Sequence, residues 1–157
     1  MSRKPNIEVT SFDEPGYQPL VDFGSWRVAM LNDIDELAPD KIDNFQCHLQ
    51  TDEVFVLLQG RCILFLAEVG EGAKNGGSVG SSDKSGQILK IEAIDMVPNK
   101  LYNIKQGVYH THTLSEDGKV LIVENRDTGD HNSPKIAVDA DIQGELSRLT
   151  AELWQVV

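Results

Sequence analysis

The sequence has 157 residues, which suits one domain, and a hydrophobic content of 40%, which suffices for a core. Its formal net charge of −11 argues against nucleic acid and anionic membranes as partners, because phosphate binding needs a basic surface. No apolar run is long enough to span a bilayer, and no apolar segment follows the basic N-terminal residues. We therefore expect neither a membrane helix nor a secretory signal.

Short runs rich in Val, Ile, Leu and Phe recur between turn signals and predict an all-β sandwich or barrel. The runs expected to form strands are Trp26–Leu31, Ile42–Leu49, Val54–Leu58, Cys62–Ala67, Ile88–Ala93, Leu101–Ile104, Tyr109–Leu114 and Val120–Glu124. A short helical turn is expected near Asp33–Leu37. Hairpin turns are expected at Gln59-Gly60-Arg61 and over Ser115–Lys119, where Gly60 can take a positive φ.

The rest of the domain organisation follows from two segments. Residues 70–87 are rich in glycine and serine and predict a long loop, with a linker between two domains as the alternative. Apolar residues at helical spacing predict one amphipathic helix over residues 140–154, capped by Asp139 or Asp141. We therefore expect one domain over residues 1–157, with its core over residues 25–126.

Compartment and assembly are indicated by two further features. Cys47 and Cys62 lie in apolar runs without a CxxC motif, which favours free thiols in a reducing cytoplasm. The run Val54–Leu58 is apolar on both faces, so both faces must be covered. The second face could be covered by the other sheet, the N-terminal arm, the C-terminal helix or a second subunit, and we favour a homodimer.

Histidines are paired with other polar residues at a spacing of two. On a strand, His48 and Gln50 would share a face, as would His110 and His112, and Glu53 begins the next apolar run. Histidine and carboxylate supply the nitrogen and oxygen ligands that transition metals bind. The pattern thus predicts a metal site, with ordinary barrel or solvent-facing histidines as the alternative.

These motifs resemble the two motifs of the cupin superfamily between about Phe45 and Glu124. His48, Glu53 and Gly60 fit the first motif, with six residues between the last two, and Gly107 and His110 fit the second. Three positions depart from the family pattern: Gln50 replaces a histidine, Lys105 a proline and Leu114 an asparagine. The resemblance implies a cupin-type double-stranded β-helix, or jelly-roll barrel, here with a C-terminal α-helix.

The resemblance also implies a ligand set. It comprises His48, Gln50, Glu53 and His110 around a divalent transition metal such as Zn, Mn, Fe, Ni or Co. His112 would be a substitute ligand or an acid–base residue. Glu124 shares a strand face with Val120 and Ile122, so it would point inward as a general base, or pair with Arg61 or Arg126 instead.

The function expected is binding of a small polar molecule, as an isomerase, lyase or oxygenase acting on a sugar or organic acid. The alternatives are a non-catalytic binding module and a metal-free enzyme that uses a histidine–carboxylate pair, as some sugar epimerases of this fold do. The segment Gly107–His110 is also similar to a segment of ureidoglycolate-lyase-type cupins, but it is too short to transfer that activity.

Overall fold

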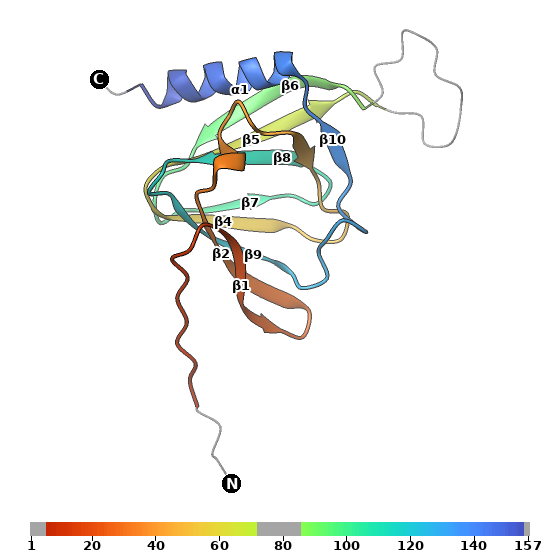
Figure 1. Ribbon diagram of the computed structural model, residues 1–157. Helices are drawn as coiled ribbons and strands as arrows, with labels where there is room; N and C mark the ends of the chain where they lie inside the picture. The colour runs from red at the N-terminus through yellow and green to blue at the C-terminus, as the bar shows by residue number, and fades with distance from the viewer. Residues whose placement is uncertain (1–5, 72–85, 156–157) are drawn as a thin grey trace.

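Residues 6–71 and 86–155, the part that this computed structural model describes, fold into two antiparallel sheets with one helix outside (Figure 1). The first sheet has the order β1-β2-β9-β4-β7, with bounds Gly16–Phe23, Trp26–Asn32, Lys119–Asn125, Glu53–Gln59 and Leu101–Ile104. The second has the order β10-β3-β8-β5-β6, with bounds Lys135–Ala137, Asn44–Gln46, Tyr109–Leu114, Cys62–Val69 and Ile88–Asp95. This arrangement confirms the predicted all-β jelly roll.

The main core lies between the two sheets. Alternate residues of β4 and β9 face it, so Phe55, Leu57, Val120 and Ile122 are almost fully buried. Their partners from the second sheet include Leu64, which is also buried. The period-two burial explains why these strands could be predicted from the sequence.

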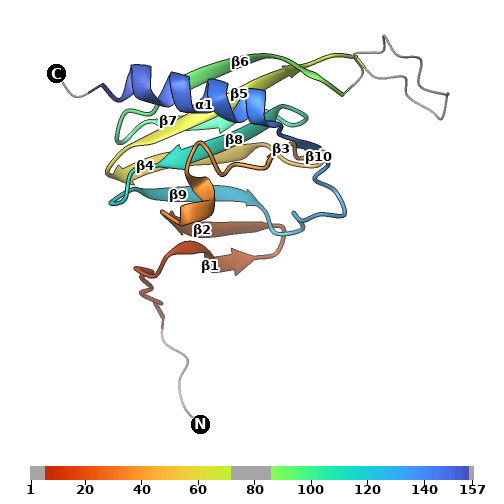
Figure 2. The same cartoon turned by 45° about the horizontal axis from the view of Figure 1, so that its top comes forward.

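The helix α1, Ala140–Leu153, packs on the outer face of the second sheet (Figure 2). Its N-terminus is capped by Asp139, whose side chain accepts a hydrogen bond from Ile142 N at 2.9 Å. Leu146 is fully buried against Ile63 and Phe65 of β5. The predicted C-terminal helix is therefore confirmed, and β5 is apolar on both faces because both are covered.

Three strands differ from the prediction. The sequence analysis missed β1 and β10, because β1 carries a register shift after Pro19 and β10 has only three residues. The strand expected over Ile42–Leu49 is the short β3, which ends at Gln46. Beyond it, the chain pairs with a later loop, since Cys47 N donates to Pro134 O and Leu49 N to Asn132 O, both at 3.1 Å.

Two expected connections can be compared with the structure. The helical turn near Asp33–Leu37 is a 3-10 helix at Asp35–Leu37, and Gly60 has a φ of 66° in the tight turn after β4. The predicted loop falls mainly on residues 72–85, outside the described residues. Its ends meet where Gly70 N donates to Gln87 O at 2.9 Å, and β5 and β6 pair directly.

The helices over residues 6–71 and 86–155 are all too short or too polar to cross a bilayer.

Candidate functional site

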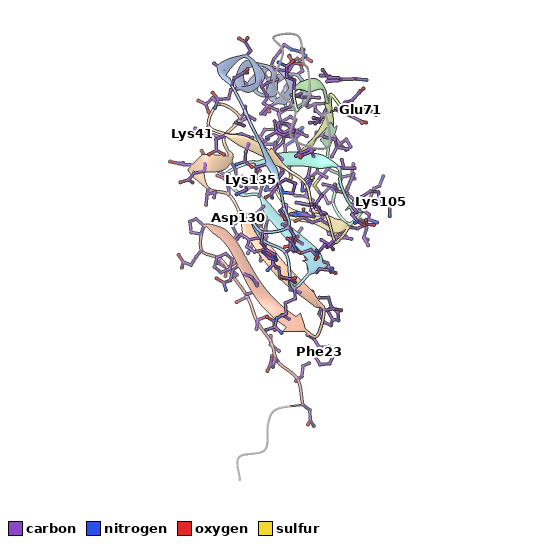
Figure 3. All side chains as sticks on the ribbon, turned by 90° about the vertical axis from the view of Figure 1, so that its right-hand side faces the viewer. Phe23, Lys41, Glu71, Lys105, Asp130 and Lys135 are labelled. Atoms are coloured by element: carbon purple, nitrogen blue, oxygen red, sulfur yellow. The ribbon has the colours of Figure 1, made fainter. Side chains whose placement is uncertain are left out.

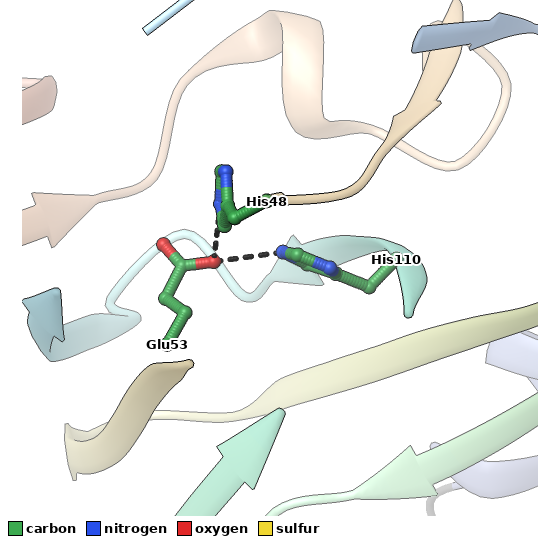
Figure 4. A group of neighbouring side chains, drawn as sticks. All are labelled: His48, Glu53 and His110. Atoms are coloured by element: carbon green, nitrogen blue, oxygen red, sulfur yellow. Dashed lines mark hydrogen bonds and ion pairs between the residues drawn. The ribbon is translucent and has the colours of Figure 1, made fainter. Parts of the chain in front are cut away.

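Three buried side chains from separate segments meet between the sheets (Figure 4). Glu53 begins β4 in the first sheet, His110 lies in β8 of the second, and His48 follows β3. Their exposed fractions are 5%, 1% and 6%. Charged and polar groups are rarely buried to this degree unless they are paired or bind a ligand.

The loop after β3 points His48 into this space. The backbone on either side of His48 is held by the loop at residues 132–134, and the carbonyl of His48 accepts a hydrogen bond from Gly107 N at 2.9 Å. Gly107 has a φ of 80°, a conformation that glycine adopts without strain. The loop before β8 is thus tied to the segment that carries His48.

Both histidines contact the same carboxylate oxygen. Glu53 Oε2 lies 2.9 Å from His48 Nε2 and 2.7 Å from His110 Nε2 (Figure 4). One ligand atom from each of the three residues lies within 4.8 Å of the others. Two imidazole nitrogens and one carboxylate oxygen form a donor set that divalent transition metals accept.

Hydrogen bonds at the opposite ring nitrogens restrict where protons can lie. His110 Nδ1 lies 2.9 Å from the carbonyl oxygen of Val108, which can only accept, so Nδ1 carries a proton. The Nε2 of a neutral His110 would then present a lone pair to Glu53 Oε2. A proton shared by these two atoms, or a metal ion bound by both of them, would remove the repulsion between two lone pairs at 2.7 Å.

The ionisation of the cluster follows from its contacts. Burial alone would raise the pKa of Glu53, but the hydrogen bonds from His110 and His48 outweigh burial and hold this pKa at about 2. Burial alone would lower the pKa of His48, but the hydrogen bond and the charge of Glu53 raise it overall. The metal-free cluster therefore holds an ionised Glu53 carboxylate that favours a proton on His48.

Glu124 is a second buried carboxylate near the cluster, and it points inward as predicted. Its Oε1 accepts hydrogen bonds from Arg27 Nη2 and from the Tyr17 hydroxyl, both at 2.8 Å. Its Oε2 lies 3.8 Å from His48 Nε2. The predicted partners Arg61 and Arg126 pair instead with Asp95 and Asp22, so Arg27 is the cation that Glu124 contacts.

His112 lies two residues after His110 on the same inward face of β8. Its ring centroid is 5.5 Å from that of Phe55, and the ring of His110 is 6.2 Å from the same phenylalanine. Burial is the main cause that lowers the pKa of His112 to about 4. His112 is therefore neutral at pH 7, and it lies outside the three-residue cluster.

Gln50 is not brought to the cluster. Its side chain is exposed, and its amide oxygen accepts a long hydrogen bond from Asn132 Nδ2 at 3.4 Å. The prediction that Gln50 shares a face with His48 assumed an extended strand, whereas β3 ends at Gln46. The other three predicted ligands lie together.

A cavity of about 330 Å³ opens beside the cluster. His48, Glu53, His112 and Glu124 line it, together with an apolar wall formed by Leu31, Ile34, Leu37 and Ile122. A cavity of this size with a few convergent polar groups is typical of a small-molecule site.

Comparison with known proteins gives the fold but no activity. No protein-family model matches the chain, and no curated protein matches it. The capsular polysaccharide assembling protein CapF from Staphylococcus aureus is similar in structure, with a TM-score of 0.50, 15% identity, and coverage of 83% of this chain and 32% of CapF. A Streptomyces PAC13 variant with uridine gives a TM-score of 0.50, 9% identity, and coverage of 85% of this chain and 87% of PAC13.

A cupin-2 domain protein from Shewanella frigidimarina covers 73% of this chain and 85% of its own, with 17% identity and a TM-score of 0.45. The two five-stranded sheets agree with these likenesses. The chain has a jelly-roll fold built from two five-stranded antiparallel sheets.

Several residues of this site were not predicted from the sequence. Tyr17 lies on β1, a strand that the sequence analysis did not predict. The residues around Arg27 show no pattern that would distinguish it from a surface arginine. Ser133 lies in the loop that holds the His48 segment, and its hydroxyl is 2.7 Å from His48 Nδ1. The inward alternation of β2, which buries Ala29 and Leu31, was the one signal that could have pointed to Arg27.

Proposed function

We propose that this protein binds a divalent transition-metal ion with His48, Glu53 and His110 and acts on a small polar molecule in the adjoining cavity. The reaction class is isomerisation, elimination or oxygen-dependent oxidation of a sugar or organic acid. The observation that carries the proposal is the approach of two Nε2 atoms to one buried oxygen of Glu53, with His110 Nδ1 committed to a carbonyl.

The residues fit a metal ion. Metal-ligating histidines usually hydrogen-bond through the other ring nitrogen, which fixes the tautomer. Here His110 Nδ1 donates to Val108 O and His48 Nδ1 contacts Ser133 Oγ, so both Nε2 atoms can face an ion. Three protein ligands leave coordination positions open, as catalytic sites require. A bound divalent ion would polarise a carbonyl or carboxylate oxygen of the substrate.

Glu124 is the group best placed to take a proton. Arg27 and Tyr17 hold its Oε1, which leaves Oε2 on the side of His48 and the cavity. A carboxylate fixed by two donors at one oxygen can accept a proton at the other without changing its position. Glu124 is therefore proposed as the base, with Arg27 and Tyr17 as positioning residues.

A second function is favoured by the contact between His110 and Glu53. If a proton and not a metal ion lies between them, the pair is a buried imidazolium–carboxylate couple that can exchange a proton with a bound molecule. The same cavity would then serve a metal-free isomerase or epimerase. Only the metal content separates the two functions.

The decisive experiment is elemental analysis of untagged protein purified without chelator. We expect close to one equivalent of Mn, Fe, Co, Ni or Zn in the wild type. The His48→Ala/His110→Ala protein should fold, by circular dichroism, and hold none.

The control variant is His131→Ala. His131 is exposed and, among the residues that the structure describes, pairs with Asp127 alone, so its replacement should leave the metal content unchanged. A wild type that holds no metal, even after incubation with each ion and dialysis, contradicts the metal proposal and leaves the His110–Glu53 proton couple.

We infer further that the protein works in the cytoplasm as a homodimer. Cys47 and Cys62 are both buried as free thiols, which suits a reducing compartment. The dimer is supported by the apolar residues on the outer face of the central strands of the first sheet.

A further inference from the structure

His112 leaves a buried nitrogen without a hydrogen-bond partner. Among the described residues, the buried side-chain atoms in this state are Asn32 Oδ1, His112 Nδ1 and Thr113 Oγ1. Of the three residues, only His112 lines the site cavity. Buried polar groups are nearly always hydrogen-bonded, and a turn of the ring would bring Nδ1 to the cavity that His112 lines.

The position of His112 separates it from the metal cluster. Its ring packs against Phe55, and it does not belong to the group of ligand atoms formed by His48, Glu53 and His110. It also lines a second cavity of about 220 Å³, so it stands in the wall between the two. A molecule bound at the cluster would reach His112 with its far end.

The charged residues of the cavity limit which chemical group of a bound molecule can lie beside His112. Arg27 is the one lysine or arginine of the cavity lining, and its guanidinium already donates to Glu124 and to the carbonyl of Thr128. Asp130, a further carboxylate of the lining, is paired with Lys135. Among the described residues of this lining, no lysine or arginine is left unpaired to receive a second carboxylate or a phosphate.

We propose that His112 is a specificity-determining residue that hydrogen-bonds an uncharged hydroxyl or carbonyl group of the bound molecule. A neutral imidazole offers one donor and one acceptor, which matches a hydroxyl group. The ligand class is therefore a polyhydroxylated compound whose end away from the cluster is neutral, such as a monosaccharide. This inference rests on the proposed cavity but not on the presence of a metal.

The experiment measures binding of neutral monosaccharides, D-glucose, D-mannose, D-galactose and D-ribose, beside D-glucuronate and D-glucose 6-phosphate. Dissociation constants come from NMR titration of wild type, His112→Phe and His112→Gln, with His131→Phe as the matched control at an exposed histidine. Each protein is assayed with and without added Zn²⁺, which is diamagnetic and leaves the ring signals observable. The ¹⁵N shifts of the His112 ring are recorded in the same titrations.

We expect at least one neutral sugar to bind more tightly than the 6-phosphate and to shift the His112 ring nitrogens. His112→Phe should weaken that binding at least about tenfold, as the loss of a buried hydrogen bond would, while His112→Gln recovers part of it. Metal content should be unchanged in both variants. This last readout separates a loss of ligand contact from a damaged metal cluster.

The inference is overturned if His112→Phe binds the sugar as tightly as the wild type, or if no neutral sugar binds. Unchanged ring nitrogen shifts on binding would also overturn it and would assign an ordered water to His112 instead. Sugar binding that depends on His112 in a wild type that holds no metal even after incubation with each ion would sustain this inference while contradicting the metal proposal.

Discussion

His110 Nε2 lies 2.7 Å from Glu53 Oε2 across the space between the two sheets. The two residues are 57 positions apart and belong to strands β8 and β4, which face each other in different sheets. Neither strand alone creates the cluster. The packing of one sheet on the other therefore builds the candidate site and the core in the same step.

Replacing the shared carboxylate should destabilise the metal-free protein. In Glu53→Gln the two histidines lose an anionic acceptor, and one Nε2 faces an amide NH₂ group. Breaking a buried charged network is costly, so we expect the free energy of unfolding to fall by about 2–4 kcal/mol. Urea unfolding of chelator-treated protein measures this.

The matched control is Glu68→Gln, on an exposed position of β5. It should change the free energy of unfolding by less than about 0.5 kcal/mol. Equal effects of the two substitutions would show that the cluster contributes nothing special to stability.

Ser133 should tune the metal affinity through His48. Ser133→Ala removes the group that contacts His48 Nδ1 at 2.7 Å, so the ring is free to rotate or change tautomer. Loss of such a support typically weakens metal binding by about 10–100-fold. Competition with a fluorescent chelator would measure the metal affinity.

The control is Ser25→Ala, at an exposed serine in the turn between β1 and β2. An equal metal affinity in the two variants would contradict the role of Ser133.

Replacing Arg27 should destabilise the protein, because the charge of Glu124 is then left buried without its partner. Arg27→Met deprives buried Glu124 of its cation, and we expect a loss of about 2–4 kcal/mol in the free energy of unfolding. The double variant Arg27→Met/Glu124→Leu removes both charges and should recover most of that loss. If the two substitutions were simply additive in chemical denaturation, the pair would not be energetically coupled.

Burial of neutral His112 makes a specific contribution to the pH dependence of stability. Its folded pKa of about 4 lies below the ordinary value of 6.5, so between these values the unfolded chain binds more protons than the folded one. The contribution of His112 to the free energy of unfolding is fully present above pH 6.5. As the pH falls to 4, this contribution is lost, which lowers the free energy of unfolding by up to about 3 kcal/mol.

In metal-free protein, His112→Phe should therefore flatten the curve of unfolding free energy against pH between 6.5 and 4. His131→Phe is the control, because His131 is exposed. A slope in His112→Phe as steep as that of the wild type would mean that His112 protonates freely in the folded state.

The sequence predicted the strands that are buried on alternate or both faces, because hydrophobic periodicity records burial directly. It could not predict where β3 ends, since the bonds from Cys47 and Leu49 to the loop at residues 132–134 form between segments over 80 positions apart. That local error is why Gln50 was grouped with His48. His48, Glu53 and His110 were grouped through the motif resemblance, whose spacing tolerates such a turn.

The residues that position Glu124 were harder to predict from the sequence than the three residues of the cluster. Arg27 and Tyr17 contact Glu124 only because β1 and β2 lie beside β9 in the first sheet. No local pattern marks a strand neighbour of this kind. Residue types with strong chemistry are visible in a sequence, whereas the partners that fix their charge depend on the assembled sheet.

The outer face of the first sheet is apolar along two rows of its central strands β2, β9 and β4. Cross-strand partners form one row, Val21, Val28, Val123, Val54 and Asn103, and beside it a second row, Gln18, Met30, Leu121, Val56 and Leu101. Phe23 and Leu101 are 71% and 75% exposed, and Phe23 projects from the end of the β1–β2 hairpin (Figure 3). Helix α1 lies on the other sheet and does not cover this face.

Neither row holds a charged residue, which is unusual for an uncovered sheet face in a chain of net charge −11. We propose that a second copy covers it, which would explain why Val54–Leu58 is apolar on both sides. Light scattering after gel filtration should give twice the chain mass.

Val123→Lys, at the centre of the first row, should give a folded monomer, because a buried unpaired lysine at a symmetric interface is costly. Leu89→Lys, on an exposed position of β6 in the other sheet, is the control and should remain a dimer. A wild type that is monomeric at micromolar concentration would mean that this face is left in solvent or meets a different partner.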